Sequence, residues 1–477
     1  MKMIIKNGNI IDPEKNCVYK GTICIKDGKI EKIVPSICEE RDFITEESGI
    51  SIIDAEGLMI GPGMVDTHVH FRDPGFTYKE DIQTGANAAK KGGYTQVVMM
   101  ANTNPHIDNV ETLKYVLEKG KETGIKVHAC GNVTMDMKGE ILTNMEELYK
   151  NGAVGFTDDG VPLVDENICG EAMKRCALIG VPISFHEENP KFIENNGVNR
   201  GKASEFYGIG GSSRAAEIDL IKRDIELAKK INESLKNAGE NATKCYLTQT
   251  SGNDTDNTNG VQSNDNTCFG CEKPCKNEVC LVIQHISTAE GVELVREGKL
   301  AGLDIHAEAT PHHFALNEEA VIEFGTNAKM NPPLRIEEDR KAIIDGLSDG
   351  TIDLIATDHA PHSLEEKAKE ITQAPSGIIG LETALSLSVK ELVDSGRMTY
   401  PELFSRNSLA PCKLYGLDGG VIKEGMDADM VIFDPNSEWT VKKEEIASKA
   451  SNTPFLDKTL KGVVKYTICR GEIVYQG

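Results

Sequence analysis

Eight apolar, β-branched runs alternate with helical patterns through the middle of this chain, and that alternation constrains the fold more than any other feature. The first run ends at His70, and the others cover residues 96–101, 126–131, 153–157, 182–186, 281–285, 303–309 and 353–358. Apolar residues at helical spacing occupy the intervals, for example over 218–231 and 287–297. Strands that alternate with helices form parallel sheets. The sequence therefore predicts an α/β fold, a (β/α)8 TIM-type barrel whose chemistry lies at the carboxyl ends of its strands.

The two ends of the chain have a different pattern. Residues 1–57 and 419–477 contain short alternating runs broken by turn residues, such as Asn7-Gly8 and Asp27-Gly28. This pattern is typical of antiparallel β-strands. We therefore expect 1–57 and 419–477 to form one small β-sandwich beside the barrel, which would occupy residues 58–418.

Residues 232–277 interrupt the alternation, because they are rich in Asn, Thr, Ser and Gly and hold few apolar residues. They predict a solvated, disordered insertion. The segment carries Cys268, Cys271 and Cys275, and Cys280 follows at the start of the sixth strand. Clustered thiolates can bind zinc or an iron–sulfur cluster. The spacing matches no established ligand motif, so a metal-binding loop and a surface loop with reduced thiols both stay open.

Charge and composition exclude several classes of partner. With 52 basic and 75 acidic residues the net charge is −23, which repels nucleic acid and anionic membranes. No run approaches the roughly 18 apolar residues of a membrane helix, and the first residues lack the apolar core of a secretory signal. The 13 scattered cysteines are typical of reduced thiols rather than of a disulfide framework. We therefore expect a cytoplasmic protein with no nucleic-acid or membrane partner.

His68 and His70 alternate at the end of the first barrel strand. Side chains at positions i and i+2 of a strand project from the same face, so the two imidazoles should lie side by side. Burial of two imidazoles without polar partners is costly. The pair therefore predicts half of a metal site, with two ordinary core histidines as the alternative.

Four further strand ends carry candidate metal ligands. Asp158 and Asp159 follow the fourth strand, and His186, His285 and Asp358 end the fifth, sixth and eighth. Each alone has an ordinary structural explanation, such as a helix N-cap for Asp159. In a barrel, however, all of these strand ends meet at one rim. Four histidines and two carboxylates suit zinc, with manganese or cobalt as alternatives.

Longer motifs around these residues resemble class I dihydroorotase, a branch of the amidohydrolase superfamily. They are HVHFRDPG at 68–75, ANTNP at 101–105, FTDDG at 156–160, NPPLR at 331–335 and TDHAPH at 357–362. The resemblance spans the whole chain except the insertion. Related hydantoinases and allantoinases place a carboxylated lysine after the fourth strand, where this chain has an aspartate pair. The chain departs from the family at Ala101, where proline is usual, and at Ser376, where an aromatic residue is common.

The resemblance implies a role for each matching residue. One or two zinc ions would be bound, one by His68, His70 and Asp358, the other by His186 and His285, with Asp159 between them. Asp159 is preferred to Asp158 because of its spacing to His186. The substrate carboxylate would contact Arg72, Asn102 and His362, and the pyrimidine ring would contact Asn331 and the backbone of Ser376 and Gly377. His312 and His313 have no metal role in this resemblance.

The implied reaction is the reversible cyclisation of N-carbamoyl-L-aspartate to L-dihydroorotate plus water, a step of de novo pyrimidine (UMP) biosynthesis. Two divalent cations lower the pKa of a bound water from about 15.7 toward 7, which makes hydroxide available to attack the cyclic amide. Asp358 would serve as general acid and base, taking the proton of the nucleophile and passing it to the ring nitrogen.

Two alternatives stay open. One is another cyclic-amide hydrolase, an allantoinase or a hydantoinase, which Asp159 at the lysine position disfavours. The other is a non-catalytic dihydroorotase-like partner of aspartate transcarbamoylase, which the intact ligand set disfavours. We also expect a homo-oligomer, and association of an active enzyme with aspartate transcarbamoylase is left open.

Overall fold

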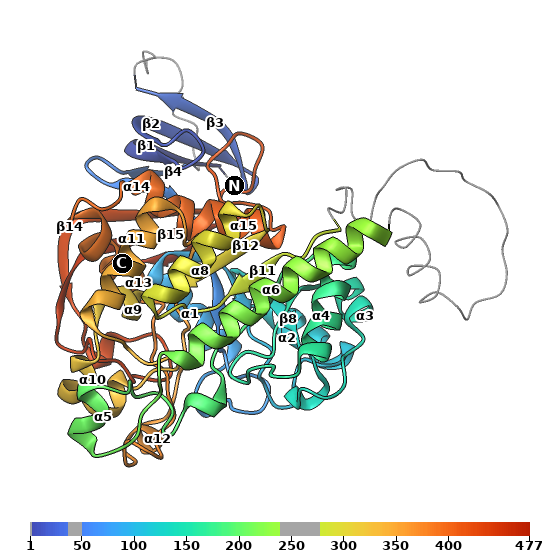
Figure 1. Cartoon of the computed structure of the whole chain (residues 1–477). Helices are drawn as coiled ribbons and strands as arrows, with labels where there is room; N and C mark the ends of the chain where they lie inside the picture. The colour runs from blue at the N-terminus through green and yellow to red at the C-terminus, as the bar shows by residue number, and fades with distance from the viewer. Residues whose placement is uncertain (1, 37–49, 239–276) are drawn as a thin grey trace, which may run out of the picture.

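The computed structural model describes residues 2–36, 50–238 and 277–477 (Figure 1). Cys268, Cys271 and Cys275, and most of the expected insertion, lie outside these residues. The helix that precedes the insertion, α6 (Ala215–Ala238), continues past the expected boundary at 232. It does so because Ile231 and Leu235 keep the helical spacing and pack against the barrel core.

Eight parallel strands form the barrel sheet, with β6 and β13 at its two edges. Their bounds are β6 (Met64–Val69), β7 (Tyr94–Met99), β8 (Lys126–Gly131), β9 (Ala153–Phe156), β10 (Ile183–Phe185), β11 (Leu281–Ile283), β12 (Ile305–Ala309) and β13 (Leu354–Ile355). Nearly every strand residue is buried, because the sheet packs side chains on both of its faces. The eight strands confirm the predicted TIM-type fold.

The edge strands meet through the chain that follows β13. Val69 forms a parallel β-bridge with His359, and the backbone N–H of His70 donates to the carbonyl of His359 at 2.9 Å. The buried carboxylate of Asp66 accepts from the backbone N–H of Thr357 at 3.1 Å. These contacts nearly close the barrel, and they hold the histidine strand beside Asp358.

Helices cover the outside of the barrel (Figure 1). The longer ones are α1 (Ile82–Gly92), α2 (Val110–Lys121), α4 (Glu166–Ile179), α6, α8 (Ala289–Leu300) and α11 (Glu337–Asp349). The shorter ones are α3 (Met145–Lys150), α5 (Lys202–Tyr207), α9 (Pro311–Ala315), α10 (Glu319–Phe324), α12 (Leu364–Lys367), α13 (Ala384–Ser388), α14 (Tyr400–Phe404) and α15 (Ala410–Tyr415). The helices expected over 218–231 and 287–297 correspond to α6 and α8. The start of α8 is defined by Thr288, whose side chain accepts from the backbone N–H of Gly291.

The two ends of the chain share a second sheet. Its order is β16-β15-β14-β5-β1-β2-β3, and β4 pairs with β1. The bounds are β1 (Lys2–Asp12), β2 (Cys17–Lys26), β3 (Lys29–Pro35), β4 (Ile50–Asp54), β5 (Met59–Pro62), β14 (Met430–Thr440), β15 (Thr459–Cys469) and β16 (Glu472–Gln476). The antiparallel pair β5 and β14 joins the two terminal segments, with Ile60 opposite Ile432.

An apolar cluster of its own supports this terminal sheet. Ile5, Ile23, Ile60, Ile432 and Ile468 are buried together, and they come from both ends of the chain. In Figure 1, β1 to β4 stand at one end of the molecule, above the barrel. The expected association of the two termini beside the barrel is therefore confirmed, and the small β-sandwich expected there is seen as one separate sheet. The domain boundaries at 57/58 and 418/419 stay predictions.

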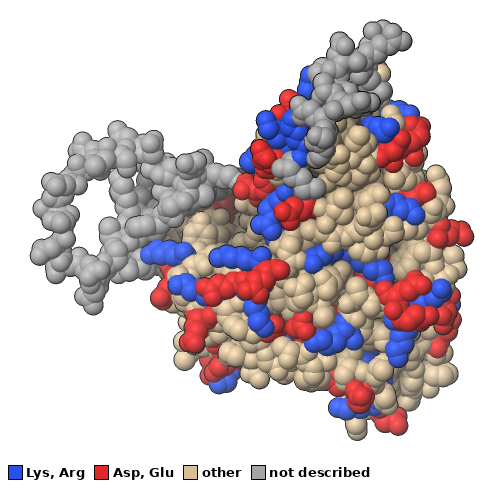
Figure 2. Space-filling view, turned by 180° about the vertical axis from the view of Figure 1, so that it is seen from behind, with Lys and Arg blue, Asp and Glu red and all other residues tan. Residues whose placement is uncertain are grey.

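On the face drawn in Figure 2, positive and negative side chains of the described residues are interspersed rather than gathered into one basic patch. Within residues 2–36, 50–238 and 277–477, no helix is both long and apolar enough to cross a membrane.

Candidate metal centre

One aspartate lies between two pairs of histidines at the carboxyl end of the barrel. Asp159 Oδ2 lies 3.4 Å from Nε2 of His68 and 3.4 Å from Nε2 of His70. Asp159 Oδ1 lies 3.7 Å from Nδ1 of His186 and 3.4 Å from Nε2 of His285. Each carboxylate oxygen therefore faces a different histidine pair.

Asp358 adds a second carboxylate beside the first histidine pair. Its Oδ1 lies 2.9 Å from Nε2 of His70 and 3.6 Å from Nε2 of His68. Asp358 has a φ of 47°, and it lies three residues after the end of β13. The structure thus brings together all six side chains that the sequence analysis singled out as metal ligands, namely His68, His70, Asp159, His186, His285 and Asp358.

Both carboxylates are ionised at neutral pH, as metal ligands must be. Burial by itself raises the pKa of Asp159, but His68 and the other histidines lower it well below the usual range. Burial also opposes ionisation of Asp358, and His70 and His68 reverse this, so that its pKa lies below its ordinary value.

The donor atoms fit a divalent cation. Among the residues that the structure describes, none makes a hydrogen bond to His68 Nε2 or to Asp159 Oδ1, although both atoms are buried. A buried polar atom without a partner costs free energy, about 1–3 kcal/mol for a neutral group. Imidazole nitrogens and carboxylate oxygens are ligands that zinc and similar borderline ions prefer. A cation between these side chains would satisfy both atoms.

Further polar side chains hold the histidines from outside. Glu308 Oε2 lies 3.1 Å from Nδ1 of His68, and Glu308 Oε1 accepts from the hydroxyl of Thr67 at 2.7 Å. Glu188 Oε2 lies 3.2 Å from Nε2 of His186. Such contacts fix the ring orientation and leave the other nitrogen for a metal.

Neither Glu308 nor Glu188 was among the residues predicted from the sequence. Glu308 lies within the apolar run 303–309, and Glu188 lies two residues after His186. The sequence did offer one indication of a role for Glu308, because it is a carboxylate inside a strand that is otherwise mostly apolar. Both side chains are 1% exposed, and such burial of a carboxylate requires polar partners.

We expect Glu308→Gln to weaken metal binding about 10- to 100-fold, because the amide is a weaker acceptor for the imidazole N–H of His68. The measurement is a competition titration of the metal-free protein against a chromophoric chelator. The exposed Glu370 provides a matched control, and Glu370→Gln should bind metal as the parent does. Equal affinity of the Glu308 variant and the parent would contradict this role.

The structure separates the two neighbouring aspartates. The carboxylate of Asp158 accepts from the side chain of Asn132 at 3.1 Å and from the backbone N–H of Val133 at 2.9 Å. It also accepts from Thr134, through both the backbone and the hydroxyl. Asp158 therefore holds the loop after β8, and Asp159 faces the histidines.

Two of the predicted substrate residues contact the histidines directly. Asn102 Oδ1 lies 2.9 Å from Nδ1 of His70, and its amide nitrogen donates to the carbonyl of Asp159 at 3.2 Å. The amide nitrogen of Asn331 lies 3.1 Å from Nε2 of His186. Both asparagines therefore line the same space as the candidate ligands.

The other predicted substrate residues belong to a connected set of loops. Arg72 Nε donates to the carbonyl of Pro361 at 3.3 Å, and His362 Nε2 lies 2.8 Å from the carbonyl of Ser376. The backbone N–H of Gly377 donates to the carbonyl of Lys329 at 2.8 Å. Arg72 lies two residues beyond His70, so these loops lie at the same rim as the metal centre.

His313, which the sequence analysis left out of the site, has structural partners. Its Nδ1 lies 2.8 Å from the hydroxyl of Thr310, and its Nε2 lies 3.0 Å from the carbonyl of Pro332. Neither His312 nor His313 belongs to the histidine and aspartate clusters found among the described residues.

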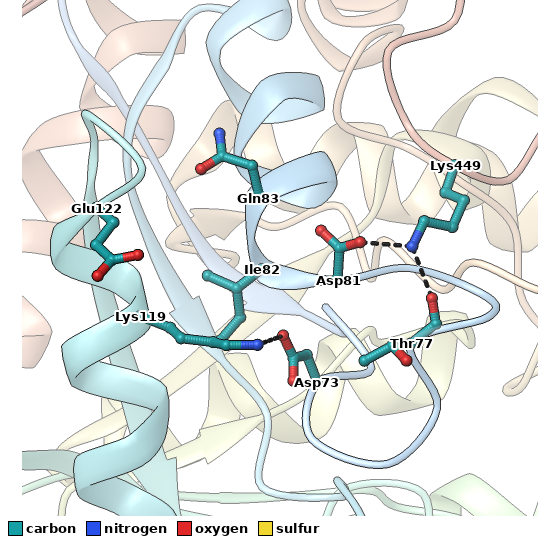
Figure 3. A pocket seen from close by; sticks show the side chains of 8 residues that line it. All are labelled: Asp73, Thr77, Asp81, Ile82, Gln83, Lys119, Glu122 and Lys449. Carbon is teal, nitrogen blue, oxygen red and sulfur yellow. Dashed lines mark hydrogen bonds and ion pairs between the residues drawn. The ribbon is translucent and has the colours of Figure 1, made fainter.

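A surface pocket of about 390 Å³ lies between α1, α2 and the segment around Lys449 (Figure 3). Four of its charged side chains form two ion pairs. Lys119 lies 2.9 Å from Asp73, and Lys449 pairs with Asp81 and donates to the carbonyl of Thr77 at 2.7 Å. None of its lining residues is a candidate metal ligand, so we assign it no part in the chemistry.

Comparison with known proteins places this centre in a family. Residues 57–234 match the family model described as dihydro-orotase-like, and residues 228–474 match the model of the amidohydrolase family. The dihydroorotase of Clostridioides difficile is 46% identical over 473 residues, which cover 99% of each chain. That of Clostridium acetobutylicum is 45% identical over 474 residues, with 99% of each chain covered.

Solved structures show the same fold. The L-hydantoinase (dihydropyrimidinase) of Arthrobacter aurescens superposes with a TM-score of 0.78 at 24% identity, over 99% of this chain and 96% of that one. A D-hydantoinase superposes with a TM-score of 0.75 at 22% identity, over 100% and 95% of the two chains. At this level of identity the likeness concerns the fold alone.

The barrel and its histidine and aspartate centre define a hydrolase of the amidohydrolase class, with side chains suited to a metal cofactor. Within that class, full-length identity above 40% to dihydroorotases is decisive. The chain belongs to the dihydroorotase family.

Proposed function

We propose that this protein is a dihydroorotase, which interconverts N-carbamoyl-L-aspartate and L-dihydroorotate plus water in pyrimidine biosynthesis. The observation that carries the proposal is the position of Asp159, whose two oxygens face separate histidine pairs. The names of its full-length relatives support the same reaction.

The proposed ligands divide into two groups around Asp159. His68, His70 and Asp358 would hold one zinc ion, and His186 and His285 would hold the other. These side chains would hold zinc, which would supply a nucleophilic water at neutral pH and polarise the amide carbonyl. Glu308 and Glu188 keep His68 and His186 oriented toward the centre.

Asp358 has a second role in the proposal. Its ionised carboxylate lies at the edge of the histidine cluster, and it can accept a proton from the attacking water. The ring nitrogen is a poor leaving group until it is protonated, so Asp358 delivers that proton to it. In the cyclisation direction the same carboxylate removes a proton from the attacking carbamoyl nitrogen.

The substrate contacts rest on the loops around the centre. We assign Arg72, Asn102 and His362 to the substrate carboxylate, and Asn331 with the backbone of Ser376 and Gly377 to the ring. A guanidinium offers a rigid fork of donors that matches a carboxylate. Asn102 and Asn331 already contact candidate ligands, which supports a substrate bound directly against the centre.

We expect Arg72→Lys to raise KM for dihydroorotate roughly 10- to 100-fold, because a charged hydrogen bond of about 1.5–3 kcal/mol to the carboxylate is lost. Turnover at saturation should fall less, since lysine keeps the positive charge. Steady-state kinetics in the ring-opening direction measure both constants. The surface residue Arg296 gives the matched control, Arg296→Lys. An unchanged KM in the Arg72 variant would remove this residue from the binding site.

One assay decides between the candidate activities. Protein of measured zinc content is offered dihydroorotate, carbamoyl aspartate, hydantoin and allantoin in separate reactions. We expect turnover of the first two compounds only. Preferred turnover of hydantoin or allantoin would instead establish the other cyclic-amide hydrolase, the alternative left open by the sequence. No turnover by zinc-loaded protein would favour a non-catalytic partner of aspartate transcarbamoylase.

Three further features stay predictions of this proposal. They are a cytoplasmic location, assembly into a homo-oligomer and association with aspartate transcarbamoylase. Size measurement of the purified protein, alone and mixed with the transcarbamoylase, tests the last two.

A further inference from the structure

A second group of side chains of the types that ligate metals lies at the opposite, amino-terminal end of the barrel strands. Cys280 precedes β11, Asp304 precedes β12, and His306 is the second residue of β12. One ligand atom from each residue lies within 4.8 Å of the others. None of these residues belongs to the centre at the carboxyl ends of the strands.

The parallel sheet explains why these three side chains meet. Leu281 pairs with Ile305 and Val282 pairs with His306, so the residues before them, Cys280 and Asp304, start neighbouring strands. Asp304 and His306 are separated by two positions and share a face. The backbone N–H of Leu281 donates to the carbonyl of Asp304 at 3.0 Å, which fixes the spacing of the two strand starts.

The histidine of this group is oriented as a metal ligand usually is. His306 Nε2 lies 3.1 Å from Asp304 Oδ1, and His306 Nδ1 lies 3.4 Å from Asp353 Oδ1. Asp353 is itself held by Lys299 at 2.6 Å. Histidine ligands commonly donate their second N–H to a carboxylate in this way, which leaves the other nitrogen for the metal.

We propose that Cys280, Asp304 and His306 bind a zinc ion at the amino-terminal end of the barrel. Thiolate, imidazole and carboxylate are the three ligand types that zinc accepts in proteins. Ligand atoms around tetrahedral zinc lie roughly 3.3–3.8 Å apart, as its bond lengths of about 2.0–2.3 Å require. His306 Nε2 and Asp304 Oδ1 lie 3.1 Å apart, and no pair of the three ligand atoms is more than 4.8 Å apart, so side-chain rotations can complete the site.

The site is accessible to an ion from solvent. It also has room for one water ligand. The side chain of His306 is 25% exposed and that of Asp304 is 24% exposed. Three protein ligands leave the fourth position of a tetrahedral ion to solvent. Binding releases the protons of the Cys280 thiol and of His306 Nε2 to solvent, because zinc binds the deprotonated forms. The ion would join the starts of β11 and β12.

Binding of Co²⁺ can be measured at the amino-terminal site separately from the centre at the carboxyl ends of the strands. Thiolate bound to Co²⁺ gives a near-ultraviolet charge-transfer band, and the six ligands of the carboxyl-end centre contain no sulfur. Metal-free full-length protein is titrated with Co²⁺, and bound zinc is measured separately by elemental analysis. We expect the band in the parent protein, and one metal equivalent fewer in Cys280→Ser, which should lack the band.

Control variants keep the result interpretable. Cys17→Ser changes a partly buried cysteine of the terminal sheet and should keep the band. His306→Asn removes a different ligand and should lower the cobalt affinity at least tenfold, which covers the case in which Cys280→Ser fails to fold. Absence of the band in the parent, or its persistence in Cys280→Ser, would overturn the proposal. Dihydroorotase activity is not part of this readout, so the two proposals fail independently.

Discussion

Asp358→Asn should lose about 10²- to 10⁴-fold in turnover in both directions, which is the usual contribution of a positioned general acid and base. Asparagine has nearly the same shape and tolerates a left-handed backbone such as the φ of 47° at this position. The fold should therefore survive. An amide cannot accept and return the proton that the ring nitrogen needs, so ring opening and ring closure fail together.

Three measurements separate the chemical role of Asp358 from its role as a ligand. Steady-state rates are taken in both directions, zinc content is measured in the same preparation, and circular dichroism checks the fold. Asp345→Asn, at an exposed carboxylate on α11, is the matched control and should be fully active. Near-normal turnover in the zinc-loaded Asp358 variant would exclude it from the mechanism.

Removal of metal should abolish turnover and also lower the melting temperature. A ligand present at about 100 times its Kd stabilises the folded state by about 2.7 kcal/mol per site, and chelation removes this stabilisation. Loss of the cations also leaves the buried atoms His68 Nε2 and Asp159 Oδ1 without a partner among the described residues. Zinc should restore both activity and melting temperature. Magnesium should not, because it prefers oxygen ligands in octahedral geometry.

The experiment compares three preparations: the protein as purified, the protein stripped of metal by a chelator, and the stripped protein reconstituted with zinc. It is repeated in Cys280→Ser, so that the proposed amino-terminal site does not contribute to the metal count. In the same background, His186→Ala should retain the metal held by His68, His70 and Asp358 and lose the other. Full activity in protein stripped of metal would contradict the proposed hydrolytic centre.

Much of the fold was predictable because periodicity reports burial. The apolar strands and the helical intervals predicted a barrel, and the alternating termini predicted a small β-sandwich; the structure has the barrel and one separate sheet built by both termini. Exact element ends were less predictable. The helix α6 passes the expected boundary at 232 because Leu235 packs on the core, and packing partners cannot be read from local composition.

Part of the candidate site was also predictable from the sequence, and part was not. The alternation of His68 and His70, and the strand-end positions of the other candidates, selected the six side chains that meet in the structure together with Asp158, which does not join them. The distinction between Asp158 and Asp159 depended on family spacing, and the structure explains it, because Asp158 accepts hydrogen bonds from the loop after β8. Glu308 was not predicted because its partner His68 is distant in the sequence. Glu188 was not predicted because its burial beside His186 is visible only in the structure.

By itself, the sequence determined the type and order of the elements and the chemical types available at each strand end, because these follow from local spacing and residue identity. Only the tertiary structure decided which groups meet. It placed the two oxygens of Asp159 against separate histidine pairs, and it brought Cys280, Asp304 and His306 together at the other end of the strands. The physical reason is that closure of the barrel and register of the sheet, which are set by packing over the whole chain, determine distances between side chains remote in sequence.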